Sequence, residues 1–241
     1  MGLTLHLAMT ASELAVAEHP PAGCGWMACH FSGYHTGLSN CPEQLPEHSV
    51  LILNDQTPPC GHDPKRIAQQ LSELAEDLKA DCVLLDLQRP SFPENAAIAK
   101  TVVETLPCPV GVSALYAQSL DCPVFLPPLP HHHTFDTHLQ SWNGRELWLE
   151  IAMDCEEITI TPEGSRWVTL SHAQEALTGF EEPDLHCRYR IKTSDEQAVF
   201  TLWRTPEDLR KLIKDAEQAG ITKAFGLYQE LSDLTKNEVC T

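Results

Sequence analysis

The middle of the chain alternates short apolar runs with segments of helical periodicity. Residues 50–53 and 80–90 contain the two runs, and each run ends in polar residues. Apolar residues recur at helical spacing over residues 63–78, where an aspartate followed by a proline is typical of a helix start, and again over residues 93–106. This succession predicts buried parallel strands that are connected by helices.

Weaker strand patterns lie on both sides of this region. Residues 158–161 and 167–170 flank a Pro-Glu-Gly-Ser turn, and residues 187–192 also alternate, which predicts a β-hairpin insertion near residues 156–192. The runs that are typical of parallel strands begin at Leu3, Gly25, Val50, Cys82, Val110, Pro123, Leu147, Val199 and Ala224.

These elements predict an α/β protein with a single (β/α)8 TIM-type barrel over residues 1–241, in which several helices are reduced to loops. An eightfold barrel needs one strand fewer than the candidates supply, so we expect one candidate to belong elsewhere. An open doubly wound sheet is the alternative, although no Gly-x-Gly-x-x-Gly or phosphate-binding loop supports it with a nucleotide.

Acids, amides and aromatic residues gather where the predicted strands end. In a barrel these ends form the active site, and such side chains suit a sugar, whose hydroxyls hydrogen bond and whose ring faces stack on aromatic rings. Polar residues also gather at strand ends simply because strands stop there. The predicted ligand-binding residues are Gln88, Asn54, Asp55, Tyr116, Asp154, Trp203 and Tyr228, and the predicted catalytic residues are Asp86 and Glu150.

Asp86 and Glu150 are the two carboxyl groups that we expect to matter most. Asp86 and Gln88 lie two apart in a strand, which places both side chains on one face. Glu150 interrupts an apolar strand, so its pKa should be raised, as a general acid requires, and it could face Asp86 across the strand ends. The alternative is an outward Glu150 that pairs with an arginine.

The segment from Asp81 to Pro90 resembles the Asp-x-x-Asp-x-Asp-x-Glu strand of family 18 glycoside hydrolases, the chitinase-like enzymes. In that family an aromatic residue and Pro commonly follow the motif. The resemblance covers residues 63–106. Asp81 and Asp86 match the first and third Asp, Leu84 replaces the second, Gln88 stands in place of the Glu, and Pro90 matches the Pro.

The resemblance implies a TIM barrel and an altered active site. In that family the Glu protonates the glycosidic oxygen, and the last Asp orients the substrate's acetamido group for substrate-assisted attack. Glutamine has no proton to give in that role. The resemblance therefore implies a distant, degenerate relative, while a chance match on an ordinary buried strand is the competing interpretation.

The histidines raise a different hypothesis. His131, His132 and His133, with His138 beyond them, could bind a divalent metal in a metal-dependent hydrolase, with His30 or Asp55 from another strand end as a further ligand. Three adjacent histidines cannot all point one way, and a solvated loop is the plainer interpretation. We expect neither a metal nor another cofactor.

The charge of the chain limits the classes of partner that it can bind. The 241 residues include 16 Lys and Arg against 34 Asp and Glu, and a net charge of −18 opposes binding to nucleic acid or to an anionic membrane.

Residues 1–9 show no basic region and no long apolar core, so we expect a cytoplasmic protein. The ten cysteines contain no Cys-x-x-Cys and are interpreted as reduced, with disulfides in an exported protein as the second possibility.

The sequence thus favours a chitinase-like barrel that binds a saccharide or glycan-like ligand, with hydrolysis weak or absent because of Gln88. Two active enzymes are the alternatives: a glycoside hydrolase that uses Glu150 and Asp86, or a metal-dependent hydrolase that uses the loop from His131 to His138. A structural or interaction barrel without a ligand is the third possibility. The sequence does not decide the oligomeric state.

Overall fold

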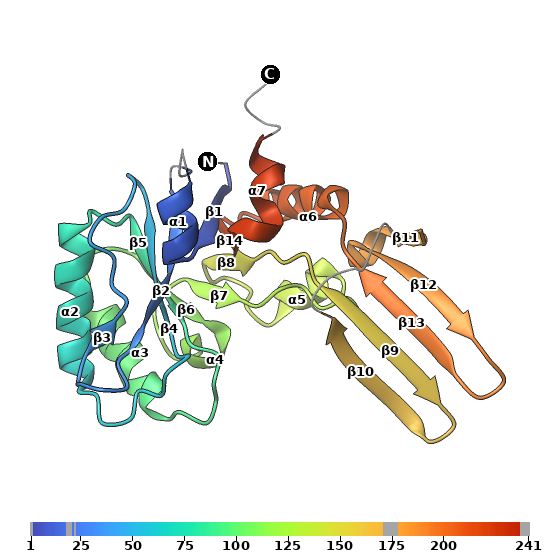
Figure 1. Cartoon of the computed structure of the whole chain (residues 1–241), viewed down its shortest axis with the longest axis horizontal. Helices are drawn as coiled ribbons and strands as arrows, with labels where there is room; N and C mark the ends of the chain where they lie inside the picture. The colour runs from blue at the N-terminus through green and yellow to red at the C-terminus, as the bar shows by residue number, and fades with distance from the viewer. Residues whose placement is uncertain (1, 18–20, 22, 171–177, 237–241) are drawn as a thin grey trace.

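Eight parallel strands close into a barrel in the computed structural model, which describes residues 2–17, 21, 23–170 and 178–236 (Figure 1). Pairing of β1 with both β14 and β2 closes the circle. The predicted (β/α)8 barrel is therefore confirmed. The barrel strands are, in spatial order, β1 (Thr4–Met9), β14 (Lys223–Leu227), β8 (Leu147–Glu150), β7 (Val124–Leu126), β6 (Val110–Ser113), β5 (Cys82–Asp86), β4 (Val50–Asn54) and β2 (Gly25–Phe31).

The helices outside the barrel differ greatly in length. The long ones are α2 (Pro64–Asp77), α3 (Glu94–Thr105) and α6 (Pro206–Gln218), and α7 (Tyr228–Lys236) follows the last strand. The segment between β2 and β4 carries only a two-residue strand, β3 (Leu38–Ser39), which pairs antiparallel with β2. As predicted, several connections are reduced; the short helices are α1 (Ala11–Val16), α4 (Ala114–Ala117) and α5 (Phe135–Gln140).

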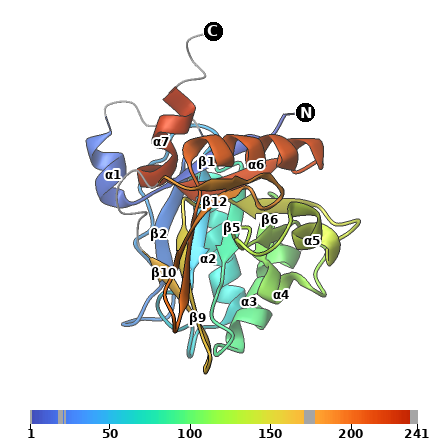
Figure 2. The same ribbon diagram turned by 90° about the vertical axis from the view of Figure 1, so that its right-hand side faces the viewer.

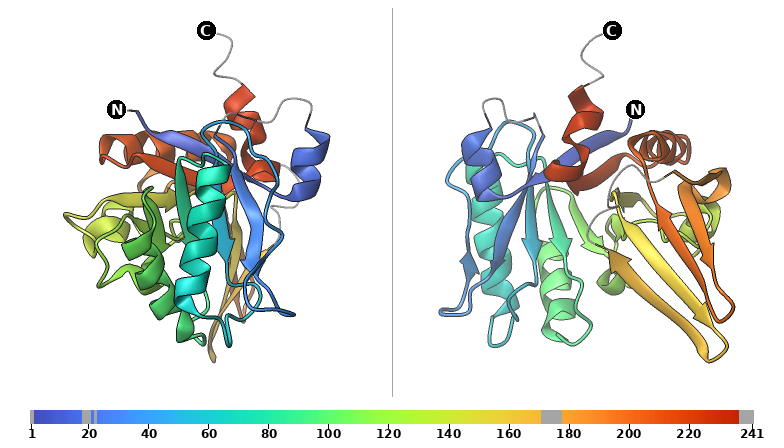
Figure 3. Two further views of the ribbon diagram at one scale, coloured as in Figure 1. Left: turned by 90° about the vertical axis from the view of Figure 1, so that its left-hand side faces the viewer. Right: turned by 45° about the vertical axis from the view of Figure 1, so that its right-hand side comes forward.

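The strand and helix from Asp63 to Asp86 show why this part of the sequence folds as predicted. The Asp63 side chain accepts a hydrogen bond from the Lys65 amide and caps α2, whose apolar stripe is buried against the barrel. Along β5 the side chains alternate, so that Cys82 and Leu84 fill the barrel interior while the intervening residues face the helices. Figure 3 shows α2 and α3 along the outside of the strands.

The barrel interior is filled by side chains rather than open. Trp148 is fully buried there beside Phe225, and a Cβ atom at Gly111 would lie 2.2 Å from the Trp148 ring. Glycine at this position therefore makes room for the largest interior side chain. The interior cluster comprises Ala8, Val50, Ile52, Cys82, Leu84, Phe125, Trp148 and Phe225.

A five-stranded antiparallel sheet is inserted between β8 and α6 and extends from one side of the barrel (Figures 1 and 2). The predicted hairpin is present as β9 and β10, but the insert also contains β13. Of the nine candidate strands, the one at Val199 lies outside the barrel, because β13 pairs with β9 and β12. In spatial order the insert strands are β10 (Gly164–Leu170), β9 (Cys155–Thr161), β13 (Ala198–Trp203), β12 (Cys187–Thr193) and β11 (Phe180–Glu182), and a short 3-10 helix, η1 (Pro183–Leu185), precedes β12.

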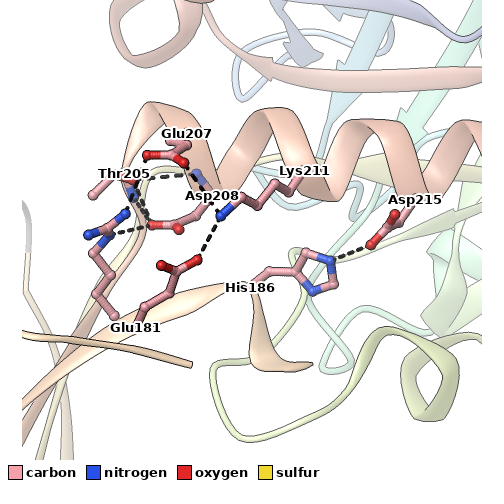
Figure 4. Close-up of polar contacts among 8 residues, drawn as sticks. Glu181, His186, Thr205, Glu207, Asp208, Lys211 and Asp215 are labelled. Atoms are coloured by element: carbon pink, nitrogen blue, oxygen red, sulfur yellow. Dashed lines mark hydrogen bonds and ion pairs between the residues drawn. The ribbon is translucent and has the colours of Figure 1, made fainter. Parts of the chain in front are cut away.

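Ion pairs attach the insert to helix α6, as Figure 4 shows. The Lys211 ammonium lies 2.6 Å from a Glu181 carboxylate oxygen, and His186 Nε2 lies 2.7 Å from Asp215. Arg188 of β12 lies 3.3 Å from Asp208, which is itself buried. These contacts join one edge of the insert to the side of α6. That the whole chain forms a single domain stays a prediction.

Candidate functional site

Asp86 and Gln88 meet at the carboxyl end of β5. Gln88 Nε2 donates a hydrogen bond to Asp86 Oδ1 at 2.8 Å, and the Gln88 side chain is exposed. Burial raises the pKa of the Asp86 carboxyl group, whereas the hydrogen bond from Gln88 lowers it in part. The alternation of the strand thus places an acid and an amide together at the rim of the barrel.

Asp55 holds the loop that carries Gln88. One Asp55 carboxylate oxygen accepts from the Gln88 amide at 3.2 Å, and the other accepts from the Arg89 amide at 2.9 Å and from Asn95 Nδ2 at 2.8 Å. Asp55 is only 4% exposed and Asn95 is fully buried. Asp55 therefore acts on the loop as a positioning residue, and sequence reasoning missed its partner Asn95 because the contact forms only in the fold.

The Ser113 side chain, at the end of β6, hydrogen bonds to the backbone of β5 beside Asp86. Its hydroxyl accepts from the Leu87 amide at 2.9 Å and donates to the Leu85 carbonyl at 3.0 Å. Sequence reasoning also missed Ser113; the available signal was a small hydroxyl residue at the end of a predicted strand. Together Ser113 and Asp55 hydrogen bond to the backbone on both sides of Asp86.

Two cavities meet at Asp86 and Gln88, which line both of them. The larger has a volume of about 730 Å³ and is also lined by His30 and Asn54. The smaller has a volume of about 230 Å³, and its walls include Glu150 together with Ser113, Phe125 and Pro127. The carboxyl end of the barrel is therefore hollowed on both sides of the pair, with polar groups beside apolar walls.

Glu150 points into the barrel and shares the smaller cavity with Asp86. It follows Trp148 by two residues in β8, so both side chains lie on the interior face. Burial raises the pKa of Glu150 to about 8, and the charges of Asp86, Glu230 and Asp154 contribute further. At neutral pH this carboxyl group is mostly protonated, a state in which it can donate a proton.

The side chains of Asn54 and Tyr116 hydrogen bond to neighbouring backbone groups. Asn54 Nδ2 donates to the Met27 carbonyl at 2.9 Å, and Asn54 Oδ1 accepts from the Gln56 amide at 3.0 Å. The Tyr116 hydroxyl donates to the Arg89 carbonyl at 2.6 Å. Asn54 lies in the cavity wall, while Tyr116 supports the loop after β5; their roles as ligand-binding residues stay predictions.

Asp154 belongs to a buried polar cluster where the insert leaves the barrel. Arg204 Nη1 donates to Asp154 Oδ1 at 2.6 Å, and its Nη2 donates to the Leu129 carbonyl at 2.6 Å. His131 lies between Asp154, at 3.4 Å, and Glu156, at 3.1 Å. Burial, together with the nearby Arg204 charge, lowers the pKa of His131 to about 3. The strongest contacts of Asp154 are therefore internal ones that link insert and barrel.

Trp203 and Tyr228 lie outside the two cavities described above. Trp203 is 3% exposed and ends β13, where it pairs with Cys155 and Arg188. Its expected place at the barrel rim is wrong for the same reason that β13 is not a barrel strand. Tyr228 begins α7 and packs, half buried, against the apolar layer between strands and helices.

The histidine loop does not support the metal hypothesis. His131 faces the two acids of the polar cluster, whereas His132 makes an edge-to-face contact with Trp167 of the insert and His138 Nε2 lies 3.0 Å from the Pro127 carbonyl. Within the described ranges, no group of three or more His, Cys, Asp or Glu residues is arranged to hold a metal ion. Over the same residues, no helix has the length and apolar character needed to cross a membrane.

Comparisons with known proteins find similarity in structure but none in sequence. No family model and no curated protein matches the sequence. A family 18 N-acetylglucosaminidase from Paenibacillus barengoltzii matches 94% of this chain and 94% of its own at 9% identity, with a TM-score of 0.60. A chitinase from Chromobacterium violaceum matches all of both chains at 7% identity, with a TM-score of 0.59.

Spore cortex-lytic enzymes named SleL also match. The chain spans 93% of its own length and 70% of the Bacillus cereus enzyme at 7% identity, with a TM-score of 0.58. It spans 56% of the Bacillus megaterium enzyme. The likeness therefore reaches well beyond residues 63–106, where the sequence resemblance lies. The chain has the (β/α)8 fold found in chitinases and related glycoside hydrolases.

Proposed function

We propose that this chain binds a saccharide at the carboxyl end of its barrel and that hydrolysis is weak or absent. The observation that carries the proposal is the Gln88 side chain, which is exposed at the cleft and hydrogen bonded to Asp86. In the family motif that the segment resembles, this position holds the proton donor. An amide there can bind a sugar but cannot protonate a glycosidic oxygen.

The cleft offers the contacts that a sugar needs. Asp86 accepts hydrogen bonds, Gln88 both donates and accepts them, and Phe125 supplies an apolar surface in the smaller cavity. The larger cavity, about 730 Å³, falls within the range of small-molecule sites. One protein of similar structure is the N-acetylglucosaminidase from Paenibacillus barengoltzii, so N-acetylglucosamine oligomers are the first ligands to test.

Titration calorimetry with such an oligomer tests the binding. We expect the wild type to bind and Asp86→Asn to weaken binding at least about tenfold, because a charged hydrogen bond contributes roughly 1.5–3 kcal/mol. Asp81→Asn is the matched control, since Asp81 precedes the same strand at its other end and pairs with His48. Absence of binding by the wild type, or equal losses in both variants, would contradict the proposal.

Gln88→Glu tests the missing acid. If the cleft is that of a degenerate hydrolase, this variant should gain turnover of a chromogenic amino-sugar glycoside over the wild type. Gln88→Ala is the control, because it removes the amide without supplying a proton. Turnover of the wild type that equals or exceeds that of the Glu variant would refute the proposed loss of hydrolysis.

Glu150 favours a second candidate function, an active glycoside hydrolase. It lines one cavity with Asp86, and its pKa of about 8 keeps it protonated at neutral pH. Under this candidate the wild type hydrolyses a glycoside, and Glu150→Gln abolishes the activity while Gln88→Ala retains it. Under the first proposal the wild type hydrolyses the glycoside weakly or not at all, so Glu150→Gln causes little or no further loss of turnover.

A further inference from the structure

Two cysteines from different segments meet beside the larger cavity. Cys29 lies in β2 and Cys41 follows β3, and their sulfur atoms are 3.9 Å apart. Cys29 is fully buried, whereas Cys41 is exposed. The pair therefore combines one thiol that solvent reaches with a second thiol directly behind it.

The local backbone explains the contact. β2 and β3 pair antiparallel, with His30 opposite Ser39, and the strand ends where Asn40 adopts a left-handed conformation with φ of 54°. Trp26 Nε1 donates to the Asn40 carbonyl at 2.8 Å and holds this turn against β2. The residue after the turn, Cys41, is thereby brought over Cys29 instead of continuing along the strand.

We propose that Cys29 and Cys41 are a reversible oxidation site, at which a disulfide ties the end of β3 to β2. A disulfide has sulfur atoms about 2.05 Å apart, so the sulfurs must approach by roughly 2 Å, which side-chain rotation and a small shift of the exposed turn can supply. The pairing goes beyond the proposed saccharide site and does not depend on it.

The two thiols differ in a way that sets the order of reaction. The hydrogen bond from Cys29 lowers the pKa of Cys41, and the same contact together with burial raises the pKa of Cys29. The Cys41 thiolate attacks one sulfur of a small disulfide such as oxidised glutathione, whose S–S bond breaks and releases one glutathione thiolate. Cys29 then gives up its proton, attacks the Cys41 sulfur and expels the second glutathione. Two protein thiols are oxidised and one small disulfide is reduced.

The disulfide would fix one wall of the larger cavity. Ala28 and His30, which flank Cys29, line that cavity, as does Asn40, the neighbour of Cys41. Oxidation therefore joins two sides of the wall by a covalent bond and restricts the turn at Asn40. If the cavity binds a saccharide, as proposed above, the oxidised and reduced forms should differ in affinity.

Mass spectrometry of the folded protein tests the pairing. The folded protein is incubated with oxidised glutathione and then denatured so that its free thiols, buried ones included, can be alkylated. It is cleaved with chymotrypsin, which can cut at Trp26, Phe31 and Leu38 and so separates Cys29 from Cys41 and Cys24. We expect a Cys29–Cys41 crosslink with the loss of two reactive thiols, both restored by dithiothreitol. Cys29→Ser should stop at a glutathione adduct on Cys41, and Cys41→Ser should show no adduct on Cys29.

Cys60→Ser is the matched control, because Cys60 is also exposed and should not affect the crosslink. Alkylation of both Cys29 and Cys41 after oxidation, or a crosslink of either one to another cysteine, would overturn the proposal. The readout involves no sugar, so it stands whether or not the oligomer binds. A change in affinity that Cys41→Ser abolishes would extend the proposal to the saccharide site.

Discussion

The barrel and the insert differ in where their large side chains lie. Trp148 is fully buried in the barrel interior, while Trp167 of the insert is 47% exposed. Trp167, Ile158, Phe200 and Ile191 form one row across four insert strands on a single face, yet none of them is fully buried. The insert is thus stabilised by strand pairing and by its contacts with the barrel and α6, whereas the barrel is stabilised by a packed core.

The end of the packed barrel interior holds two acids whose pKa values are raised. Glu150 and Asp86 lie at the end of the packed interior, and burial raises the pKa of both groups. Along the exposed part of the insert sheet, charged residues such as Arg166 and Lys192 remain in contact with water. Two buried acids with raised pKa values beside one cavity make the barrel end a place to look for chemistry.

The two tryptophans give the largest expected contrast. Trp148→Ala should lower the free energy of unfolding by about 3–5 kcal/mol, because it leaves a cavity in the barrel interior. Trp167→Ala should lower it by about 1 kcal/mol or less, since much of that ring is already in water. Urea unfolding of both variants measures the difference; equal losses would contradict the contrast between core and insert.

Glu150→Gln should show a pH-dependent gain in stability. The pKa of Glu150 is raised to about 8 in the folded protein, whereas it is near 4.5 in the unfolded chain. As the pH rises from about 4 to 8, the unfolded chain loses this proton while the folded protein keeps it, so the free energy of unfolding of the wild type falls. Glutamine carries no such charge, so the variant should gain about 1.4 kcal/mol relative to the wild type for each pH unit between roughly 5 and 8.

Unfolding in urea at pH 5.5 and 7.5 gives the measurement for Glu150→Gln. Glu146→Gln is the control, because Glu146 precedes the same strand and is more exposed to solvent. A difference between Glu150→Gln and wild type that stays constant with pH would show that the carboxyl group is ionised in the folded protein.

The attachment of the insert to α6 should give the smallest effect. Arg188→Met removes the contacts with Asp208 and Glu207 and should cost about 1 kcal/mol or less, because Arg188 is partly exposed and Asp208 keeps its capping bonds with Thr205. Lys192→Met on the same strand is the control. A loss as large as that of Trp148→Ala would mean that the ion pairs, rather than the strands, hold the insert in place.

The sequence was most informative where local signals agree. The cap at Asp63, the apolar stripe of α2 and the following apolar run all indicated the same strand and helix, and the structure has them there. Which of the nine candidate strands lies outside the barrel was not predictable, because a short strand has the same pattern in a parallel barrel and in an antiparallel sheet. The expected place of Trp203 at the barrel rim is wrong for the same reason.

The candidate site was predictable only in part for the same reason. Asp86 and Gln88 share a face because strands repeat every two residues, and this holds whatever surrounds them. That Glu150 shares a cavity with Asp86 depends on closure of the barrel, and the role of Asp55 depends on a loop more than thirty residues further along the chain. No local pattern encodes such contacts.

Amide chemical-shift mapping with an N-acetylglucosamine oligomer shows whether a saccharide binds at the barrel end. We expect the signals of residues 54, 86–89 and 113–115 to shift in a saturable way, because these residues border the two cavities there. Signals of the β9–β10 hairpin and of α6 should remain in place. Saturable shifts confined to the insert, or none anywhere at millimolar oligomer, would contradict a saccharide site in the barrel.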